Sequence, residues 1–409
     1  MRDFELSLRL ISQTAALLLL SDSFLRACLL LLRAAIPKRA TAGSNTASEA
    51  VSGVASDASG GCVILIAARD EAGTIGPTVT ALKESLVEWP GSSLWVAADR
   101  CSDRTAIEAI AAGAKVAERP DENSNEGKCA VIAWWLSRYE SEWRSRDAVL
   151  ILDADSRLMK GSLLALRKSM TAGGDDLAAL QSFVAPDAGE GAGRLAGWSE
   201  VLMQRIDDEA RRRLGWSVPL RGTGMAFRGD ALARLAPRLR TLAEDLELDV
   251  LLASERKRVE FVPEAVVLDP KPRRASGASR QRARWFQGQL QVLRGYRREI
   301  AAALLKGGLG AWFLLPLLLM RPKILFIGSR SLLLFISIWI PSLFWIAMAG
   351  LGMDAVYYLW GAAMVDNPRR YLFDLLTAPR YAAMWLYGFG IAIIRRERRG
   401  ERIWLRSGR

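Results

Sequence analysis

Two carboxylates separated by one residue directly follow an apolar run. Asp153-Ala154-Asp155 comes straight after Ala148–Leu152 (AVLIL), which is typical of a buried strand. Carboxylates at positions i and i+2 at a strand end can ligate one hard divalent cation. Mg²⁺ or Mn²⁺ fits, because such an ion keeps several waters and is commonly completed by substrate phosphates. The alternative is a helix N-cap or a turn, since Asp favours both. The strand in front of the pair favours a metal site at Asp153 and Asp155.

The chain contains no histidine, which limits the chemistry that remains. Histidine general bases, Ser-His-Asp triads and His-ligated zinc are therefore excluded. The four cysteines include no CxxC pair and indicate buried thiols in a reducing compartment. With 409 residues, 51% of them apolar and a net charge of +12, the chain is too apolar to be disordered. Catalysis must then depend on carboxylates, Lys, Arg, hydroxyls or a hard metal ion.

The elements that would position these groups alternate between strands and helices from residue 62 to 270. This succession predicts an α/β fold with a mostly parallel sheet and helices on both faces. The expected strands are Cys62–Ala67, Ser93–Ala98, Val116–Glu118 and Ala148–Leu152. The expected helices are Thr74–Leu86, Arg104–Ala112 and Cys129–Trp143. Since functional groups collect beyond the carboxyl ends of parallel strands, the acidic residues at those ends should face one crevice.

Several short motifs follow one another in a specific order. They are Arg69-Asp70-Glu71, Asp99 with Asp103, Lys128, Asp153-Ala154-Asp155, Arg221-Gly222-Thr223-Gly224, Glu244-Asp245 and Gln281–Trp285 (QRARW). This set resembles the membrane-associated family 2 glycosyltransferases of GT-A fold, which include cellulose, hyaluronan and poly-N-acetylglucosamine synthases. The resemblance covers roughly residues 62–290. One departure is that the family's usual TED reads Ala243-Glu244-Asp245 here.

The resemblance implies a nucleotide-binding set of residues. Glu71 and Asp99 correspond to positions that contact the uracil and ribose of a nucleotide sugar, and Arg69 belongs to the same set. Lys128 corresponds to the lysine that approaches the diphosphate. Asp153 and Asp155 match the DxD motif, with Asp155 the more direct ligand of Mg²⁺ or Mn²⁺. The QxxRW residues Gln281, Arg284 and Trp285 correspond to an interfacial helix over the nucleotide and the acceptor.

The resemblance also implies an acceptor site and a catalytic pair. Thr223 and Gly224 correspond to residues that line the acceptor site, together with Trp285. Asp245, with Glu244 beside it, corresponds to the catalytic base. A single carboxylate that deprotonates the acceptor, without a covalent intermediate, inverts the anomeric centre. Trp285 could instead be an interfacial anchor.

Other charged residues have ordinary interpretations. Glu126-Gly127-Lys128 could be a solvated turn, and Asp70 could cap the helix that begins near Thr74. Arg211–Arg213 are interpreted as a solvated or lipid-facing stripe. Glu247 and Asp249 are expected to face solvent.

Apolar stretches near both ends predict membrane helices. Ser331–Met348 is 18 residues without a charge, which gives a helix of about 27 Å, close to the thickness of a bilayer core. Leu351–Val365 is a candidate return span, and Tyr381–Ile394 suits an interfacial helix. The stretch Leu8–Ile36 is apolar but contains charges, among which Asp22 and Arg26 could pair at i, i+4. It predicts a tilted anchor or a broken hairpin, with a cleaved signal peptide as the alternative.

These patterns divide the chain into six parts. They are an N-terminal anchor or hairpin (1–37), a linker (38–61), the GT-A catalytic domain (62–275), interfacial helices with QxxRW (276–308), C-terminal membrane and interfacial helices (309–394) and a basic tail (395–409). The tail has seven Arg against two Glu and is expected to stay cytoplasmic. The expected location is the bacterial inner (plasma) membrane, with the catalytic domain in the cytoplasm.

The leading hypothesis is an inverting, metal-dependent glycosyltransferase. It would move a sugar from a nucleotide sugar, a UDP-sugar in particular, to a lipid-linked or growing polysaccharide acceptor in cell-surface or exopolysaccharide synthesis. The expected partners are donor, acceptor, lipid bilayer and other polysaccharide-assembly proteins, but no nucleic acid. A nucleotidyltransferase on a similar fold and a non-catalytic membrane scaffold are the alternatives. Processive synthesis and single addition both remain open.

Overall fold

The computed structural model describes residues 21–37, 60–120, 127–187, 192–270, 275–319, 323–383, 385 and 387. Its centre is an eight-stranded sheet with the order β3-β2-β1-β4-β7-β6-β8-β5. The four predicted strands are confirmed as β1 (Cys62–Ala68), β2 (Ser93–Asp99), β3 (Lys115–Arg119) and β4 (Ala148–Leu152). All pairs among them are parallel.

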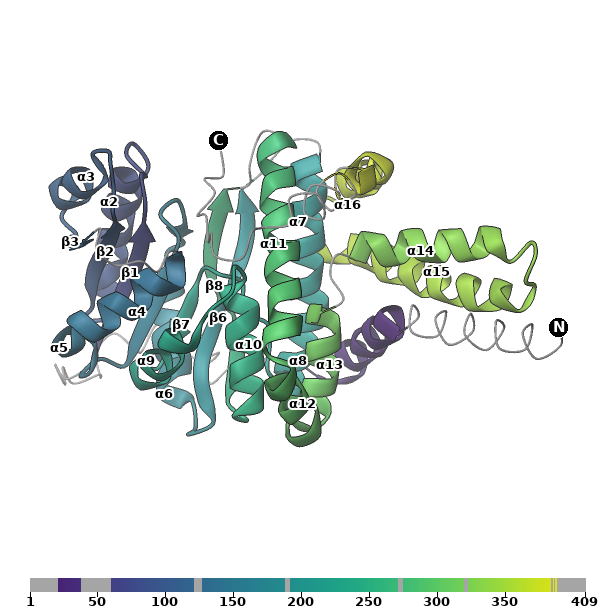
Figure 1. The fold of residues 1–409 in the computed structure, drawn as a ribbon, viewed down its shortest axis with the longest axis horizontal. Coiled ribbons are helices and arrows are strands. Elements are labelled where there is room, and N and C mark those ends of the chain that lie inside the picture. Colours follow the sequence, from purple (N-terminus) through teal and green to yellow (C-terminus); the bar gives the residue numbers. More distant parts are fainter. Residues whose placement is uncertain are drawn as a thin grey trace.

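Helices cover both faces of this half of the sheet (Figure 1). Val63 and Leu65 of β1 pack with Trp135 of α4 (Lys128–Arg138). Ile64 and Ile66, one residue out of phase, pack with Val79 of α2 (Ile75–Ser85). The two-residue period of the strand thus divides its side chains between two cores. The other helices here are α3 (Thr105–Ala112) and α5 (Glu140–Trp143). The predicted helix over 129–143 is interrupted at Tyr139, where α4 ends.

The second half of the sheet was not defined by the sequence. It contains β5 (Arg157–Leu158), β6 (Leu177–Asp187), β7 (Met225–Phe227) and β8 (Arg258–Pro270). The three-residue strand β7 lies antiparallel between β4 and β6, so that Phe227 pairs with Val149 and with Ala179. The intervening helices are α6 (Ser162–Ala172), α7 (Ala192–Leu202), the π-helical η2 (Met203–Asp208), α8 (Glu209–Leu214), α9 (Gly229–Leu235) and α10 (Glu244–Ser254).

After β8, the described chain contains the 3₁₀ turn η4 (Ala362–Met364), a helical stretch over 378–383 and six longer helices. The six are α11 (Ala275–Gly295), α12 (Arg297–Lys306), α13 (Gly308–Leu319), α14 (Lys323–Ile336), α15 (Ser342–Gly361) and α16 (Pro368–Leu375). The predicted single helix over Ser331–Met348 is wrong, because α14 ends at Ile336 and α15 begins after Pro341. The segment is apolar, but a turn between α14 and α15 interrupts the predicted helix. Among the described residues, Ser342–Met364 is the one helical segment whose length and composition would allow a membrane crossing. Figure 1 shows α14 and α15 as a hairpin that projects away from the sheet.

Residues 21–35 form a helix near the base of this hairpin (Figure 1). The predicted pairing of Asp22 with Arg26 is wrong, since each side chain binds a distant segment. Arg26 donates to Asp207 in η2, and Asp22 accepts from Arg330 in α14. Arg330 also donates to Asp354 of α15 at 2.5 Å. These contacts attach the helix of residues 21–35 both to the α14–α15 hairpin and to η2. Residues 1–20, most of the predicted linker and the basic tail lie outside the described residues.

Candidate active site

Lys128 joins two of the predicted motifs. Its Nζ donates to Asp153 Oδ1 at 2.5 Å and to the carbonyl of Gly222 at 2.6 Å. The Lys128 side chain is 12% exposed, and that of Asp153 is 41% exposed. Burial alone would lower the pKa of Lys128, but Asp153 and Glu244 raise it above its ordinary value. The end of β4, the start of α4 and the loop Arg221–Gly224 therefore form one charged site.

The loop Arg221–Gly224 is held against the DxD segment. Thr223 Oγ1 accepts from the backbone N–H of Asp153 at 3.1 Å and lies 2.9 Å from Ser156 Oγ. Gly224 has φ +66°, and a Cβ there would lie 2.9 Å from Val267 Cγ2. Only glycine therefore fits this position without strain. The loop thus holds Thr223 beside Asp153 and Ser156, just beyond the end of β4.

Gln181 is a supporting residue that the sequence did not reveal. This fully buried side chain lies on β6. Its Nε2 donates to the carbonyl of Thr223 at 3.1 Å, and its Oε1 accepts from the N–H of Arg221 at 3.0 Å. A buried polar residue inside an apolar strand was the available signal, because such a group requires partners.

The predicted catalytic pair lies in the first turn of α10. Asp245 is half-buried, and its Oδ1 accepts from the N–H of Leu246 at 2.8 Å. Burial and the neighbouring Asp245 raise the pKa of Glu244, while Lys128 and Arg284 oppose that rise. The same electrostatic interactions show that Glu244 lies near Lys128 and Arg284. The structure thus gathers the DxD, ED and QxxRW charges around one site.

Two further acids of α10 support the site from inside. Glu247 is fully buried and accepts from the backbone N–H groups of Arg240 and Thr241 at 2.6 and 2.9 Å. Asp249 is 1% exposed, and its two carboxylate oxygens lie 3.1 and 3.2 Å from the N–H of Leu220. The prediction that both face solvent is wrong. They satisfy backbone donors of the loops that precede Glu244 and Arg221.

The QxxRW segment lies on α11 and packs on the start of α10. A Cβ at Gly288 would lie 2.6 Å from Ala243 Cβ, so the two helices approach closely. Arg284 Nε is buried without a hydrogen-bond partner among the described residues, and Trp285 is 46% exposed. The side chain of Gln281 lies outside the described residues. Arg284 is thus a cation that interacts with Glu244, and its Nε–H is available to a ligand.

Among the nucleotide-binding residues predicted at the ends of β1 and β2, Asp99 already has two arginine partners. Asp99 is fully buried and accepts from Arg119 at 3.0 Å and from Arg100 at 3.3 Å. The N–H of Glu71 donates to Thr105 Oγ1 at 2.7 Å. A nucleotide contact by Asp99 would therefore require an exchange of partners. The roles of Arg69, Glu71 and Asp99 stay predictions.

Asp70 does not cap α2. Its carboxylate accepts from the N–H and Oγ of Ser102 at 2.7 and 3.0 Å, and the N-cap Thr74 has no side-chain cap bond. Ligand atoms of Asp70, Cys101 and Asp103 lie within 4.8 Å of one another. Because backbone N–H groups already bind both carboxylates, we assign no metal to this group.

The three arginines of α8 do not form a solvated stripe. Arg211 is 2% exposed and donates to Asp208 at 3.3 Å and to the carbonyl of Phe313 at 3.1 Å. Arg212 and Arg213 both bind Glu209, at 2.7 and 2.9 Å. The prediction is wrong because α13 covers Arg211 and because Glu209 offers a local partner.

Asp153 and Asp155 fit a divalent cation. Both carboxylates are partly exposed beyond the end of β4, and one of them already attracts a cation, the Lys128 ammonium. Oxygen ligands at this spacing suit Mg²⁺ or Mn²⁺ better than softer metals.

The fold of the chain is similar to that of a solved glycosyltransferase. The structure is similar to mannosyltransferase PcManGT from Pyrobaculum calidifontis in complex with GDP-Man and Mn²⁺, with TM-score 0.52 and 15% identity over 95% of this chain and 98% of that one. This likeness shows a GT-A glycosyltransferase fold. Glucosyl-3-phosphoglycerate synthase from Mycobacterium tuberculosis, in complex with Mn²⁺, UDP and phosphoglyceric acid, is less similar. It gives TM-score 0.38 and 20% identity over 61% of this chain and 80% of that one. No curated protein sequence matches the chain.

The sequence itself defines the family. The model described as glycosyl transferase family group 2 matches residues 148–353, from β4 into α15. This is half of the chain, and the protein therefore belongs to this family of glycosyltransferases.

Proposed function

We propose that the protein is an inverting, metal-dependent transferase that moves a sugar from a nucleotide sugar to a lipid-linked or growing polysaccharide acceptor. One observation carries the proposal: Lys128 joins Asp153 to the carbonyl of Gly222, with Glu244 close by. The proposed diphosphate site and the proposed acceptor loop are therefore adjacent. Cell-surface or exopolysaccharide synthesis is the process that such a reaction serves.

Asp245 is the proposed base. The acceptor hydroxyl gives its proton to the Asp245 carboxylate and attacks the anomeric carbon from the face opposite the diphosphate, so that the configuration inverts. Thr223 lies at the acceptor side, fixed by Asp153 and Ser156. The chain has no histidine, so the base at this site must be a carboxylate.

Lys128 and Arg284 stabilise the leaving group. Negative charge grows on the diphosphate as the glycosidic bond breaks, and preorganised cations at that position lower the barrier. Lys128 is held by two hydrogen bonds, and Arg284 Nε is a buried donor with no hydrogen-bond partner among the described residues. Mg²⁺ or Mn²⁺ held by Asp153 and Asp155 would supply further positive charge to the same diphosphate. Trp285 offers a flat apolar face to a sugar ring.

The donor nucleotide is proposed to be UDP. The similar structure of PcManGT contains GDP-Man and Mn²⁺, so GDP is the alternative that the experiment must separate. Both nucleotides present the same diphosphate to Lys128 and Arg284.

A membrane location is proposed from the exposed apolar surface of the hairpin. Trp339 and Trp345 near its tip are 67% and 76% exposed. Between Arg330 and Asp354 the hairpin contains no charged residue, which suits a lipid environment. At its base, α16 exposes Phe373 beside the exposed Arg370, the pattern of an interfacial helix. We place the protein at the plasma membrane of a bacterium, with the sheet on the cytoplasmic side.

The proposal is tested with purified protein and a panel of nucleotide sugars in Mn²⁺. Membranes of the bacterial expression host serve as the acceptor source, and released UDP or GDP is measured. We expect release from one class of UDP-sugar, with its loss in Asp155→Ala. Pyrophosphate release from a nucleoside triphosphate would identify a nucleotidyltransferase instead. If calorimetry with UDP and GDP shows no heat of binding, the result would favour a non-catalytic membrane scaffold. The length of the labelled product separates processive synthesis from single addition.

A further inference from the structure

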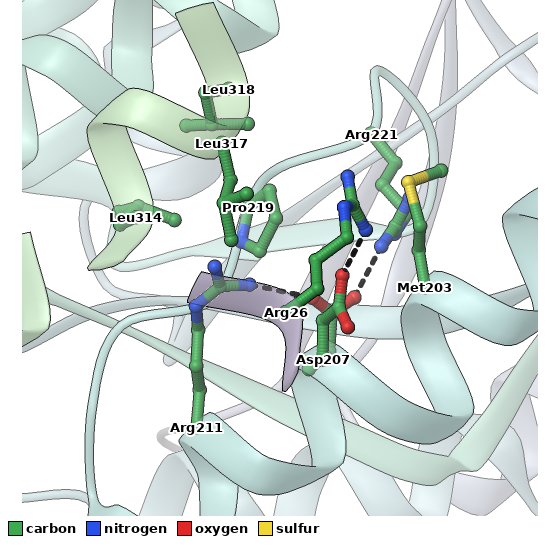
Figure 2. A pocket seen from close by; sticks show the side chains of 10 residues that line it. Arg26, Met203, Asp207, Arg211, Pro219, Arg221, Leu314, Leu317 and Leu318 are labelled. Carbon is green, nitrogen blue, oxygen red and sulfur yellow. Dashed lines mark hydrogen bonds and ion pairs between the residues drawn. The ribbon is translucent and has the colours of Figure 1, made fainter. Parts of the chain in front are cut away.

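Five buried charged side chains form a cluster next to the loop Arg221–Gly224. They line a small cavity whose apolar wall is Leu314, Leu317 and Leu318 of α13 (Figure 2). Its charged members, which we call the buried cluster, are Arg26, Asp207, Asp208, Arg211 and Arg221. None of these side chains is more than 5% exposed.

The buried cluster contains two sets of ion pairs, which meet at the adjacent residues Asp207 and Asp208. Arg26 donates to Asp207, and Arg221 donates to Asp208. Arg211 donates to Asp208 at 3.3 Å. Loss of one partner from a buried pair leaves an uncompensated charge, which is more disruptive than loss of both. The two sets therefore constrain each other through the backbone that joins Asp207 to Asp208.

The two aspartates are adjacent in the π-helical segment η2. Gln204 of the same segment fixes η2 to β6. The Gln204 Oε1 accepts from the N–H of Val184 at 2.7 Å, and its Nε2 donates to the carbonyl of Val184 at 2.8 Å. Single π-helical turns inside α-helices occur frequently at functional sites. Here the π-helical segment carries Asp207 toward the helix of residues 21–35 and Asp208 toward the loop of Arg221.

The loop requires such support. Gly222 and Gly224 both have positive φ, +78° and +66°, and glycine at these positions leaves the free loop more conformations than other residues would. Yet Gly222 must present its carbonyl to Lys128, and Thr223 its hydroxyl to Asp153. Arg221 is the residue of this loop that the buried cluster holds.

We propose that Arg26, Asp207, Asp208 and Arg221 are positioning residues for the acceptor side of the site. They act through Gly222 and Thr223 and do not contact the reacting groups. The helix of residues 21–35 is then a working part of the transferase, because Arg26 pairs with Asp207. The inference rests on the proposed function only where it assigns this loop to the acceptor.

The test compares two arginines of one helix in the full chain. Arg26→Met removes the partner of Asp207, whereas Arg33→Met removes an arginine whose Nε donates to the carbonyl of Arg205 at 2.7 Å but which pairs with no cluster carboxylate. Hydrogen–deuterium exchange is followed in peptides that contain residues 203–208 and 221–224. We expect Arg26→Met to speed exchange in both peptides at least fivefold. Arg33→Met should leave exchange at residues 221–224 within twofold of wild type, because its contact with Arg205 does not extend to the Arg221 loop. Arg26→Lys should restore slow exchange.

Activity gives a second readout. With expression-host membranes as acceptor source, Arg26→Met should lower kcat/KM for transfer at least tenfold, while the Kd of UDP or GDP in Mn²⁺ stays within twofold. Equal effects of Arg26→Met and Arg33→Met, or unchanged exchange at residues 221–224, would overturn the inference. If no nucleotide sugar is turned over, the proposed function fails, and the exchange experiment still decides about positioning.

A double variant covers the case in which Arg26→Met does not fold. Arg26→Met with Asp207→Asn removes both charges, so no unpaired carboxylate remains in the interior. We expect it to fold, to show the faster exchange at residues 221–224, and to lose transfer at least fivefold. Wild-type exchange in this folded double variant would contradict the inference.

Discussion

Replacement of Lys128 by Met should change metal and nucleotide affinity in opposite directions. In the ligand-free protein the ammonium binds Asp153 Oδ1 at 2.5 Å, so it competes with a cation for that carboxylate. Lys128→Met removes the competitor and its positive charge. Mn²⁺ alone should then bind more tightly. A nucleoside diphosphate should bind less tightly, because it loses a charged donor.

The magnitudes follow from the hydrogen bonds that Lys128 makes. A hydrogen bond to a charged group contributes about 1.5–3 kcal/mol. Asp153 is 41% exposed, and solvent screening reduces the pair to about 1–2 kcal/mol. With 1.4 kcal/mol for each factor of ten, the Kd of Mn²⁺ should fall by about 5–30-fold. The Lys128 side chain is only 12% exposed, so loss of its bond to the diphosphate should raise the Kd of UDP in saturating Mn²⁺ by about 10–100-fold.

Isothermal titration calorimetry measures both affinities. Lys160→Met is the matched control, because Lys160 is an exposed lysine that follows the DxD segment in the sequence. We expect Lys160→Met to leave both values within twofold. Weaker or unchanged Mn²⁺ binding in Lys128→Met would refute the assignment of the cation site to Asp153.

Two further expectations concern stability. A Cβ at Gly224 meets Val267 and Ser182, whereas none of the described atoms lies within 4 Å of a Cβ at Gly222. In denaturant unfolding, Gly224→Ala should therefore lower the free energy of unfolding by about 1–3 kcal/mol and Gly222→Ala by only about 1 kcal/mol. A larger loss in Gly222→Ala than in Gly224→Ala would be inconsistent with this loop conformation. The raised pKa of Glu244, caused by burial and by Asp245, means that the folded protein binds this proton more tightly than the unfolded chain. The free energy of unfolding then falls as pH rises from the ordinary pKa of Glu through the raised value, so Glu244→Gln should raise Tm at pH 7 and lose this advantage near pH 4. A Tm below wild type at pH 7 would show that the ionised carboxylate stabilises the fold.

The first half of the fold could be predicted because its strands are apolar runs that end at polar residues. Ala148–Leu152 was predicted with its observed bounds, and the DxD pair lies directly beyond it. The family motifs then identified Lys128 and Glu244, which the structure places near each other. Local periodicity and short motifs were sufficient where strand and helix alternate regularly.

The rest depends on contacts between distant segments. β7 is three residues long and is defined only by its pairing with β4 and β6. Glu247 and Asp249 resemble ordinary surface acids in sequence, yet backbone donors of two loops hold them inside. Arg26 resembles a charge in a membrane anchor, but its partner Asp207 lies in the catalytic domain. A single sequence contains no local signal for such partners.

The most direct test of the central claim is the transfer rate of Asp245→Asn. The variant keeps the size of the side chain and removes its ability to accept a proton. Asp230→Asn, an exposed aspartate on α9, is the control. With the nucleotide sugar that the wild type turns over, we expect transfer to fall by about 10²–10⁴-fold, while the Kd of the nucleotide in Mn²⁺ stays within twofold. Transfer by Asp245→Asn at the rate of the Asp230→Asn control would contradict the account.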